Sequence, residues 1–186
     1  MPNEVIEVKD KNELYSLFPK NGVGAELGVC QGDNAVMLYK HTQPSSLYLV
    51  DIWIKDELTY KNCPPHLYYD DWMQMVSEKL PHPNVHLVRQ DTLKWLDSLP
   101  DNFLDWVYID SFHQYHHVNE EYKRAIKKVK KGGVISGHDF FCHPKAWRTG
   151  VIRAVLNQVN DHKLIMTHIT CESEMPSTLC INTKDQ

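Results

Sequence analysis

The chain has 186 residues, of which 42% are hydrophobic and 24% charged, as is ordinary for a soluble globular protein that fits in one domain. Its formal net charge of -4 gives no electrostatic reason to expect a nucleic-acid partner, and no apolar run is long enough to span a membrane. The first ten residues, MPNEVIEVKD, lack a signal-peptide pattern, and the five cysteines form no C-x-x-C pair, so we expect a cytoplasmic protein with reduced thiols.

Hydrophobic periodicity and turn residues divide the first part of the chain into alternating helices and strands. In chain order we expect a helix over 11–19, a strand over 22–29, a helix over 33–42, a strand over 45–53, a helix over 68–80, a strand over 84–91, a helix over 92–99 and a strand over 103–111. The first helix is expected to bury Leu14, Leu17 and Phe18 on one face. The second is expected to begin with Asp33 or Asn34 as its N-cap.

The rest of the chain continues this alternation. It is expected to form a helix over 114–133 with Gly132 as its C-cap signal, a strand over 133–140, a helix over 150–161, and strands over 163–170 and 177–184. The last two strands have no helix between them, which predicts an antiparallel closing hairpin. The whole pattern predicts a doubly wound, mostly parallel α/β sheet of about seven strands with helices on both faces. No repeat or linker divides residues 1–186, so we expect one domain.

Polar or glycine residues follow each of the first five predicted strands. In chain order these residues are Gly28 with Gly32, then Asp51, Asp91, Asp110, and finally His138 with Asp139. Ligands of such sheets bind outside the carboxyl ends of the strands, so we expect these residues to surround one site. Any one of the acids could instead cap a helix, and Asp91 before Thr92 is equally well placed to do so.

The stretch VGAELGVCQGDNA has a glycine pattern of its own, because Gly24, Gly28 and Gly32 recur every fourth residue. Glu26 stands between the first two of them. The spacing matches neither the G-x-G-x-x-G of a dinucleotide site nor the G-K-[ST] of a P-loop. Glycine lets a ligand approach bare backbone, so this turn predicts a different ligand, although tight packing of strand against helix would also require glycine.

Two sets of motifs resemble known methyltransferases. The E-x-G-x-x-x-G that starts at Glu26, with acids after the next two strands, resembles class I S-adenosylmethionine-dependent methyltransferases. The stretches IDSFHQY and GGVISGHD together resemble the signature of small-molecule O-methyltransferases, a group that includes the macrocin and mycinamicin sugar methyltransferases. The resemblance extends from Gly22 to about Lys184 and implies a Rossmann-like methyltransferase fold.

The resemblance implies S-adenosylmethionine as the cofactor. The residues it implies for cofactor binding are Glu26, Gly28, Gly32, Asp51, Ile52, Asp91, Thr92 and Asp110. Among them, Glu26 would hold the amino-acid end of the cofactor, and Asp51 would accept hydrogen bonds from the ribose hydroxyls. Asp91 with Thr92 would meet the adenine edge.

The resemblance also implies methyl transfer to a hydroxyl of a small molecule, for which a sugar is one candidate. Asp110 and His113 would be the catalytic residues, and His113 would be the general base for the acceptor hydroxyl. Asp110, His138 and Asp139 would hold a divalent metal such as magnesium or manganese. The related enzymes carry two acids where this chain has His138 and Asp139. Imidazole favours softer metals than magnesium, so the identity of the ion and its presence stay open.

Two other functions stay open at this point. A catalytically inactive S-adenosylmethionine-binding or sensor domain is favoured by the altered His138-Asp139 pair, whereas Asp110 and His113 argue against it. A divalent-metal hydroxylase resembling the cephalosporin hydroxylases would share the scaffold. The expected partner is a small-molecule hydroxyl acceptor rather than a nucleic acid or a membrane, and assembly into a homo-oligomer is left open.

Three further expectations concern residues around the rim. The stretch over 52–65 is predicted to be irregular, and most aromatic side chains in and around it are expected to pack in the core, although such a stretch is also a usual place for a substrate lid. His143 is a candidate to line the acceptor pocket. His116 and His117 are predicted to flank the site or to face solvent, because their helix turns Tyr115 and Val118 inward.

Overall fold

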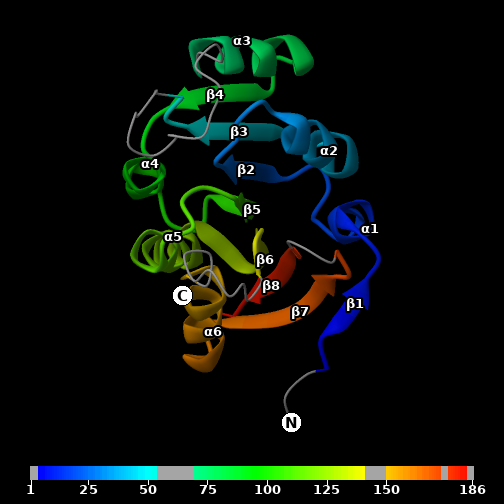
Figure 1. The fold of residues 1–186 in the computed structure, drawn as a ribbon, viewed down its shortest axis with the longest axis vertical. Helices are drawn as coiled ribbons and strands as arrows, with labels where there is room; N and C mark the ends of the chain where they lie inside the picture. The colour runs from blue at the N-terminus through cyan, green and yellow to red at the C-terminus, as the bar shows by residue number, and fades with distance from the viewer. Residues whose placement is uncertain (1–3, 54–68, 141–149, 173–175, 184–186) are drawn as a thin grey trace.

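The structure is a computed structural model that describes residues 4–53, 69–140, 150–172 and 176–183 (Figure 1). Its strands are β1 (Ile6–Val8), β2 (Val23–Leu27), β3 (Ser46–Asp51), β4 (Val85–Arg89), β5 (Leu104–Ile109), β6 (Val129–Gly137), β7 (Leu164–Thr170) and β8 (Thr178–Asn182). They form one sheet in the order β1-β7-β8-β6-β5-β2-β3-β4. Among these strands, β8 is antiparallel to both of its neighbours, and the other pairs are parallel.

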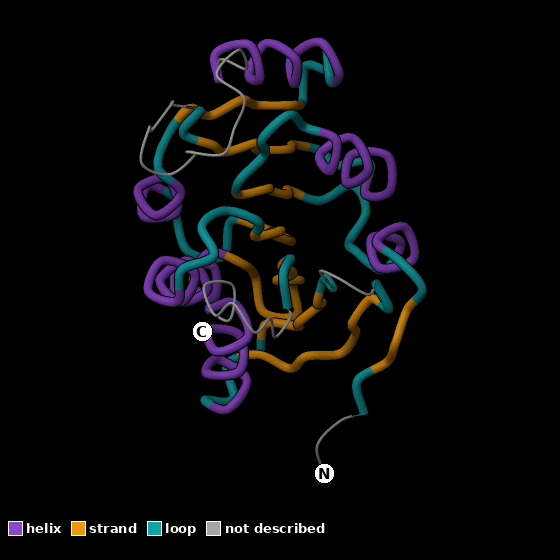
Figure 2. The backbone as a smooth tube through the Cα atoms, in the orientation of Figure 1, coloured by secondary structure: helices purple, strands orange, loops and turns teal. Residues whose placement is uncertain are grey.

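Helices cover both faces of this sheet (Figure 2). They are α1 (Lys11–Ser16), α2 (Asp33–Thr42), α3 (Tyr69–Lys79), α4 (Thr92–Ser98), α5 (Tyr115–Lys128) and α6 (Gly150–Asn160). One core cluster joins the sheet to α4, α5 and α6 through side chains such as Trp95, Tyr122 and Val155. A second cluster joins it to α1, α2 and α3 through residues that include Leu38 and Val76. The predicted doubly wound α/β fold is confirmed.

The structure differs from the prediction in the strands at one side of the sheet. There are eight strands among the described residues rather than about seven, because β1 was not predicted. β1 has only three residues, of which the first two are exposed, so it is too short to show a period of two. β7 and β8 are antiparallel as expected, but β8 lies between β6 and β7, and β1 forms the edge of the sheet.

Two helix ends were also predicted wrongly. α1 ends before Leu17, which is 45% exposed, and Tyr15 takes the buried position instead. α5 ends at Lys128 rather than at Gly132, because pairing with β5 draws Val129 into β6. Gly132 therefore lies inside β6, with a φ of 79°, and does not cap the helix.

The arrangement of the strands places the predicted site residues on one edge. The chain order reverses between β2 and β5, which are parallel neighbours. In such sheets the crevice outside the carboxyl ends of the strands at this reversal is the usual ligand site. The segments that leave β2, β3, β4, β5 and β6 all start at this edge, so the fold brings residues from distant parts of the sequence together there.

None of the helices in the described part of the chain combines the length and apolar character that crossing a membrane requires. The stretch from residue 54 to residue 68 and His143, which the sequence made candidates for a lid and for the acceptor pocket, lie outside the described residues.

Candidate functional site

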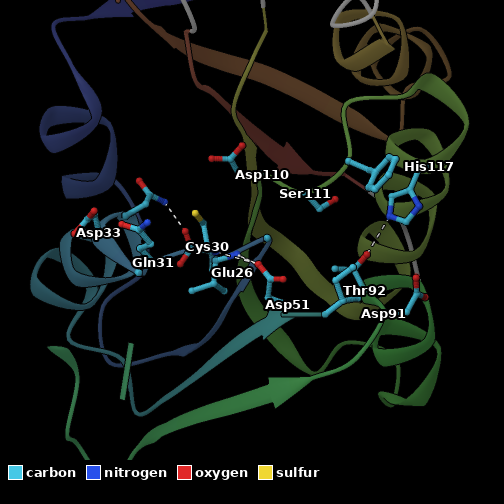
Figure 3. A pocket seen from close by; sticks show the side chains of 16 residues that line it. Glu26, Cys30, Gln31, Asp33, Asp51, Asp91, Thr92, Asp110, Ser111 and His117 are labelled. Atoms are coloured by element: carbon cyan, nitrogen blue, oxygen red, sulfur yellow. Dashed lines mark hydrogen bonds between the residues drawn. The ribbon is translucent and has the colours of Figure 1, made fainter. Parts of the chain in front are cut away.

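A cavity of about 640 Å³ lies at the carboxyl ends of β2, β3, β4 and β5 (Figure 3). Its wall includes every residue that the sequence predicted for cofactor binding, namely Glu26, Gly28, Gly32, Asp51, Ile52, Asp91, Thr92 and Asp110. In the view of Figure 3, Gln31 and Asp33 lie at one side, Asp51 lies in the middle, and Thr92 lies at the other side. The structure thus brings these residues together, and their individual roles stay predictions.

The glycine turn closes the cavity along β2. Gly28 and Gly32 have φ values of 84° and 83°, in the left-handed region that favours glycine. A Cβ atom on Gly28 would lie 2.2 Å from the backbone oxygen of Asp110, and one on Gly32 would lie 2.9 Å from a methyl group of Val76. Both glycines therefore line the cavity and also allow close packing, so the packing explanation is supported and the ligand explanation stays a prediction.

We expect Gly28→Ala to destabilise the protein far more than Gly132→Ala. Both glycines have a positive φ, but at Gly132 no atom of the described residues, apart from the glycine and its chain neighbours, lies within 4 Å of the Cβ position. The control should therefore lose only the roughly 1–2 kcal/mol cost of left-handed backbone, whereas Gly28→Ala should lose about 2 kcal/mol more because β2 must move away from β5. Urea unfolding of both variants measures the difference, and equal losses would contradict the close approach.

Asp51 is held rigidly by the turns around it. Its Oδ2 accepts hydrogen bonds from the backbone amides of Val29 at 2.8 Å and Cys30 at 3.0 Å. Its Oδ1 accepts one from the amide of Trp53 at 2.9 Å. A carboxylate offers about four acceptor positions, so Asp51 keeps capacity for roughly one further donor, such as a ribose hydroxyl.

Glu26 lines the cavity and has one buried, unpartnered oxygen. Its side chain is buried, and Oε1 accepts a hydrogen bond from Asn34 Nδ2 at 2.8 Å. The hydroxyl of Tyr15 donates to Asn34 Oδ1 at 2.7 Å and so fixes the orientation of that amide. Glu26 Oε2 is buried without a hydrogen-bond partner in the described structure. Burial raises the pKa of Glu26 to about 8, so the side chain is largely protonated at neutral pH.

This arrangement corrects the predicted N-cap of α2. Gly32 occupies the N-cap position and makes no side-chain hydrogen bond there. Asn34 is engaged by Glu26, and the carboxylate of Asp33 pairs with the ammonium group of Lys79. Neither Asp33 nor Asn34 therefore caps the helix, because tertiary contacts take both side chains.

The opposite end of the cavity is formed by the start of α4. Asp91 caps this helix by accepting a hydrogen bond from the amide of Lys94 at 3.0 Å, and it also lines the cavity. The next residue, Thr92, donates its hydroxyl proton to Glu121 of α5 at 2.5 Å. Glu121 was not predicted from the sequence, although its spacing of three residues from Val118 indicates a position on the buried face of the helix.

His117 lies beside the site. It was predicted to flank the site or to face solvent, and its partly exposed side chain lines the cavity in the first turn of α5. Its ring lies 5.4 Å from the ring of Phe112, which also lines the cavity. The reason is that α5 begins directly after the loop that leaves β5, so its first turn faces the ligand edge of the sheet.

Four ionisable side chains converge where β5 and β6 end. His113 Nε2 lies 3.8 Å from Asp110 Oδ1 and also contacts Asp139 Oδ2. His138 Nδ1 lies 3.4 Å from Asp110 Oδ1 and 3.6 Å from Asp139 Oδ1. Asp139 has a φ of 56°, a conformation that non-glycine residues adopt mainly where the surrounding structure enforces it. Because Asp110 also lines the cavity, this cluster is continuous with it.

The charges of the cluster stabilise one another. Burial alone would lower the pKa of His113, but hydrogen bonds with Asp110 and Asp139 outweigh burial and raise it to about 9. For both carboxyl groups burial alone would raise the pKa, and contacts with the histidines outweigh it and lower the pKa. His113 is therefore an imidazolium at neutral pH in this arrangement, and it must lose a proton before it can act as a base.

The cluster has the donor chemistry of a divalent metal site. Asp110, His113 and Asp139 each place a potential ligand atom within 4.8 Å of the others. Asp139 Oδ1 is buried and has no hydrogen-bond partner among the described residues. The predicted ligand set contained His138 in place of His113, and the structure brings both imidazoles to the two carboxylates. Mixed nitrogen and oxygen donors suit manganese, iron or zinc better than magnesium.

The fold and the site together define a class. A doubly wound sheet carries a cavity with a glycine turn at its reversal point, and acids after the neighbouring strands line it. This is the organisation of class I methyltransferases that the sequence motifs resembled. A protein-family model described as a methyltransferase domain matches residues 25–140, more than half of the chain. The chain therefore belongs to this methyltransferase family.

Solved methyltransferase structures share the fold at low identity. A candidate rRNA methylase from Clostridium thermocellum is 11% identical, with a TM-score of 0.67 over 95% of each chain. The N-methyltransferase NodS from Bradyrhizobium japonicum is 12% identical, with a TM-score of 0.66 over 94% of this chain and 93% of its own. A candidate methyltransferase from Streptococcus mutans, solved with SAH, is 12% identical, with a TM-score of 0.64 over 92% and 95%. No curated protein sequence matches the chain significantly.

Proposed function

We propose that residues 1–186 form one methyltransferase domain that moves a methyl group from S-adenosylmethionine to a hydroxyl of a small molecule. The observation that carries this proposal is the position of Asp110, which lines the cavity and also contacts His113 and His138. Groups able to move a proton thus stand beside the cavity for the cofactor. The small-molecule O-methyltransferase subgroup remains part of the proposal, supported by the IDSFHQY and GGVISGHD motifs.

The residues that line the cavity favour one orientation of the cofactor, with its amino-acid end at Glu26 and its adenine at Thr92. Its volume of about 640 Å³ is within the range of pockets that enclose a ligand of this size. The unpartnered oxygen of Glu26 suits the ammonium group of the amino-acid end, and Asp51 suits a ribose hydroxyl. The adenine then lies toward Thr92, and the sulfonium methyl lies toward Asp110.

The reaction needs alignment and removal of one proton. The acceptor oxygen attacks the methyl carbon, the carbon–sulfur bond breaks with its electron pair staying on sulfur, and the hydroxyl proton leaves to a base. Holding the two reactants in line supplies much of the acceleration. His113 is the proposed base, and neutralising either carboxylate beside it lowers its pKa and frees Nε2 to accept the proton. A divalent ion held by Asp110, His138 and Asp139 would lower the pKa of a coordinated hydroxyl and leave His113 available as the base.

We expect the protein to bind S-adenosylhomocysteine, and Asp51→Asn to weaken that binding at least about tenfold. In one orientation, the side-chain NH2 group of the variant would face the backbone N–H groups of Val29 and Cys30, which are also donors. In the other orientation, the side chain would lose the acceptor for the ribose hydroxyl. Calorimetric titration measures the affinity. Asp105→Asn is the matched control. Asp105 also accepts a hydrogen bond from a backbone amide of β2, that of Val23 at 2.7 Å, but this amide lies at the opposite end of the strand from the cavity.

The control should lose stability and keep its affinity for S-adenosylhomocysteine. Failure of the unchanged protein to bind S-adenosylhomocysteine, with or without manganese, would overturn the proposed cofactor. The acceptor is tested separately, with methyl-labelled S-adenosylmethionine and a panel of small alcohols, sugars, amines and RNA. Label recovered on oxygen supports the proposal, whereas label recovered only on nitrogen or on RNA contradicts it.

A further inference from the structure

A partly buried polar network closes the end of the cavity near α4 and α5, where the proposed function places the adenine. It consists of Thr92, Ser111, His117 and Glu121. We infer that Glu121 is a positioning residue that makes this end of the cavity select a purine with an amino group at its 6-position over one with an oxo group. The inference rests on the proposed function, because it takes the nucleoside of S-adenosylmethionine as the ligand.

The network is centred on one carboxylate oxygen. Glu121 is fully buried, and its Oε1 accepts hydrogen bonds from Thr92 Oγ1 at 2.5 Å and from Ser111 Oγ at 2.6 Å. His117 Nε2 lies 3.3 Å from the same oxygen and 3.2 Å from Thr92 Oγ1. Glu121 Oε2 is buried without a hydrogen-bond partner among the described residues. Side chains from α4, from the loop after β5 and from α5 therefore meet at Glu121.

This geometry fixes the direction of the hydroxyl protons. A hydroxyl group has one proton and two lone pairs, and both Thr92 and Ser111 direct their proton to Glu121. Both residues line the cavity, so they can offer it only lone pairs. The carboxylate of Asp91, which also lines the cavity, adds further acceptors. These side chains can accept a hydrogen bond from a 6-amino group. They have no proton to donate to a 6-oxo oxygen, whose lone pairs they would repel.

His117 reinforces this polarity. Burial alone would lower the pKa of His117, but its contact with Glu121 outweighs burial and raises it. Nε2 is the ring nitrogen that faces Glu121 and Thr92, so a proton on this nitrogen is directed to them and not to the cavity. The neighbouring ring of Phe112 is apolar and offers no competing donor.

Glu121→Gln tests the inference through a ratio of two affinities. The probes are S-adenosylhomocysteine and S-inosylhomocysteine, which differ at the 6-position of the purine and in the proton on its N1, and both are titrated calorimetrically. The unchanged protein should prefer the adenosyl compound about 10- to 100-fold, the loss expected when a buried hydrogen bond cannot form. In the variant the new amide can donate to the hydroxyl oxygens and turn their protons into the cavity, so the preference should fall below about threefold.

Glu120→Gln is the matched control, because Glu120 is the preceding residue of α5 and pairs with Lys123 and Arg124 away from the cavity. Its preference should equal that of the unchanged protein. A preference near one in the unchanged protein, or an equal loss of both affinities in Glu121→Gln, would overturn the inference. Absence of any S-adenosylhomocysteine binding would instead overturn the proposed function and the inference with it.

If Glu121→Gln does not fold, Ser111→Ala replaces it. This change removes one of the two hydroxyl acceptors and leaves Glu121 in place. The preference for the adenosyl compound should then fall at least about threefold, as expected for one lost hydrogen bond. An unchanged preference in this variant would overturn the inference.

Discussion

Replacing His113 by alanine should lower the rate of methyl transfer by about 10²- to 10⁴-fold, which is the usual contribution of a general base. The affinity for S-adenosylhomocysteine should stay within about threefold of that of the unchanged protein, because His113 does not line the cavity that holds the cofactor. The measurements are the release of S-adenosylhomocysteine during turnover of an acceptor found in the panel and the calorimetric affinity.

His116→Ala controls for the loss of a histidine nearby. His116 is exposed on the first turn of α5, three residues after His113, and should be replaceable without effect on turnover. If His113→Ala turned over as fast as the unchanged protein, His113 would not be the general base, and another group would have to accept the proton of the acceptor hydroxyl. If the unchanged protein binds S-adenosylhomocysteine but transfers no methyl group to any acceptor, the sensor function left open by the sequence would replace the enzymatic one.

The fold could be predicted largely because its central elements have clear burial patterns. The strands β2 and β5 are almost continuously buried, as is typical of parallel strands covered on both faces. The helices α2 and α6 are long enough for buried positions to recur every three to four residues. The errors fall where local sequence does not decide. β1 has three residues, and the end of α5 is set by the pairing of Val129 with Leu104 across the sheet, which no local pattern reveals.

The candidate site was predictable for a topological reason and only in part. Residues that directly follow parallel strands must share one edge, so the acids after β3, β4, β5 and β6 were expected to meet. The contacts that give them specific properties join segments far apart in sequence. Thr92 and Ser111 reach Glu121 across 29 and 10 residues, and the chain from Tyr15 through Asn34 to Glu26 depends on how α1 packs against α2. Their partners emerge only from the fold.

Glu26 gives the second large effect, on stability as a function of pH. Burial raises its pKa in the folded chain to about 8, compared with 4.5 for the ordinary side chain. Between these values the folded chain holds a proton that the unfolded chain has released. Stability contributed by this residue is therefore lost as pH rises from about 4.5 to 8, by at most about 1.4 kcal/mol per pH unit.

Glu26→Gln should abolish that pH dependence, because its amide can accept from Asn34 as Oε1 does but does not ionise. Urea unfolding at pH values of about 5 and 8 measures the free energy of unfolding of both proteins. The stability of the unchanged protein relative to the variant should fall by about 3 kcal/mol across this interval, and the other titrating groups cancel in the comparison. A difference independent of pH would contradict a protonated Glu26.

The same proton connects stability to cofactor binding. An ammonium group placed at the unpartnered Oε2 of Glu26 favours the ionised carboxylate, so binding of S-adenosylhomocysteine near neutral pH should expel the proton. Calorimetry in buffers of different ionisation enthalpy should detect the release of up to about one proton by the unchanged protein, and less by Glu26→Gln. Because burial of Glu26 destabilises the empty protein most at high pH, an ammonium ligand there should stabilise it most under the same conditions.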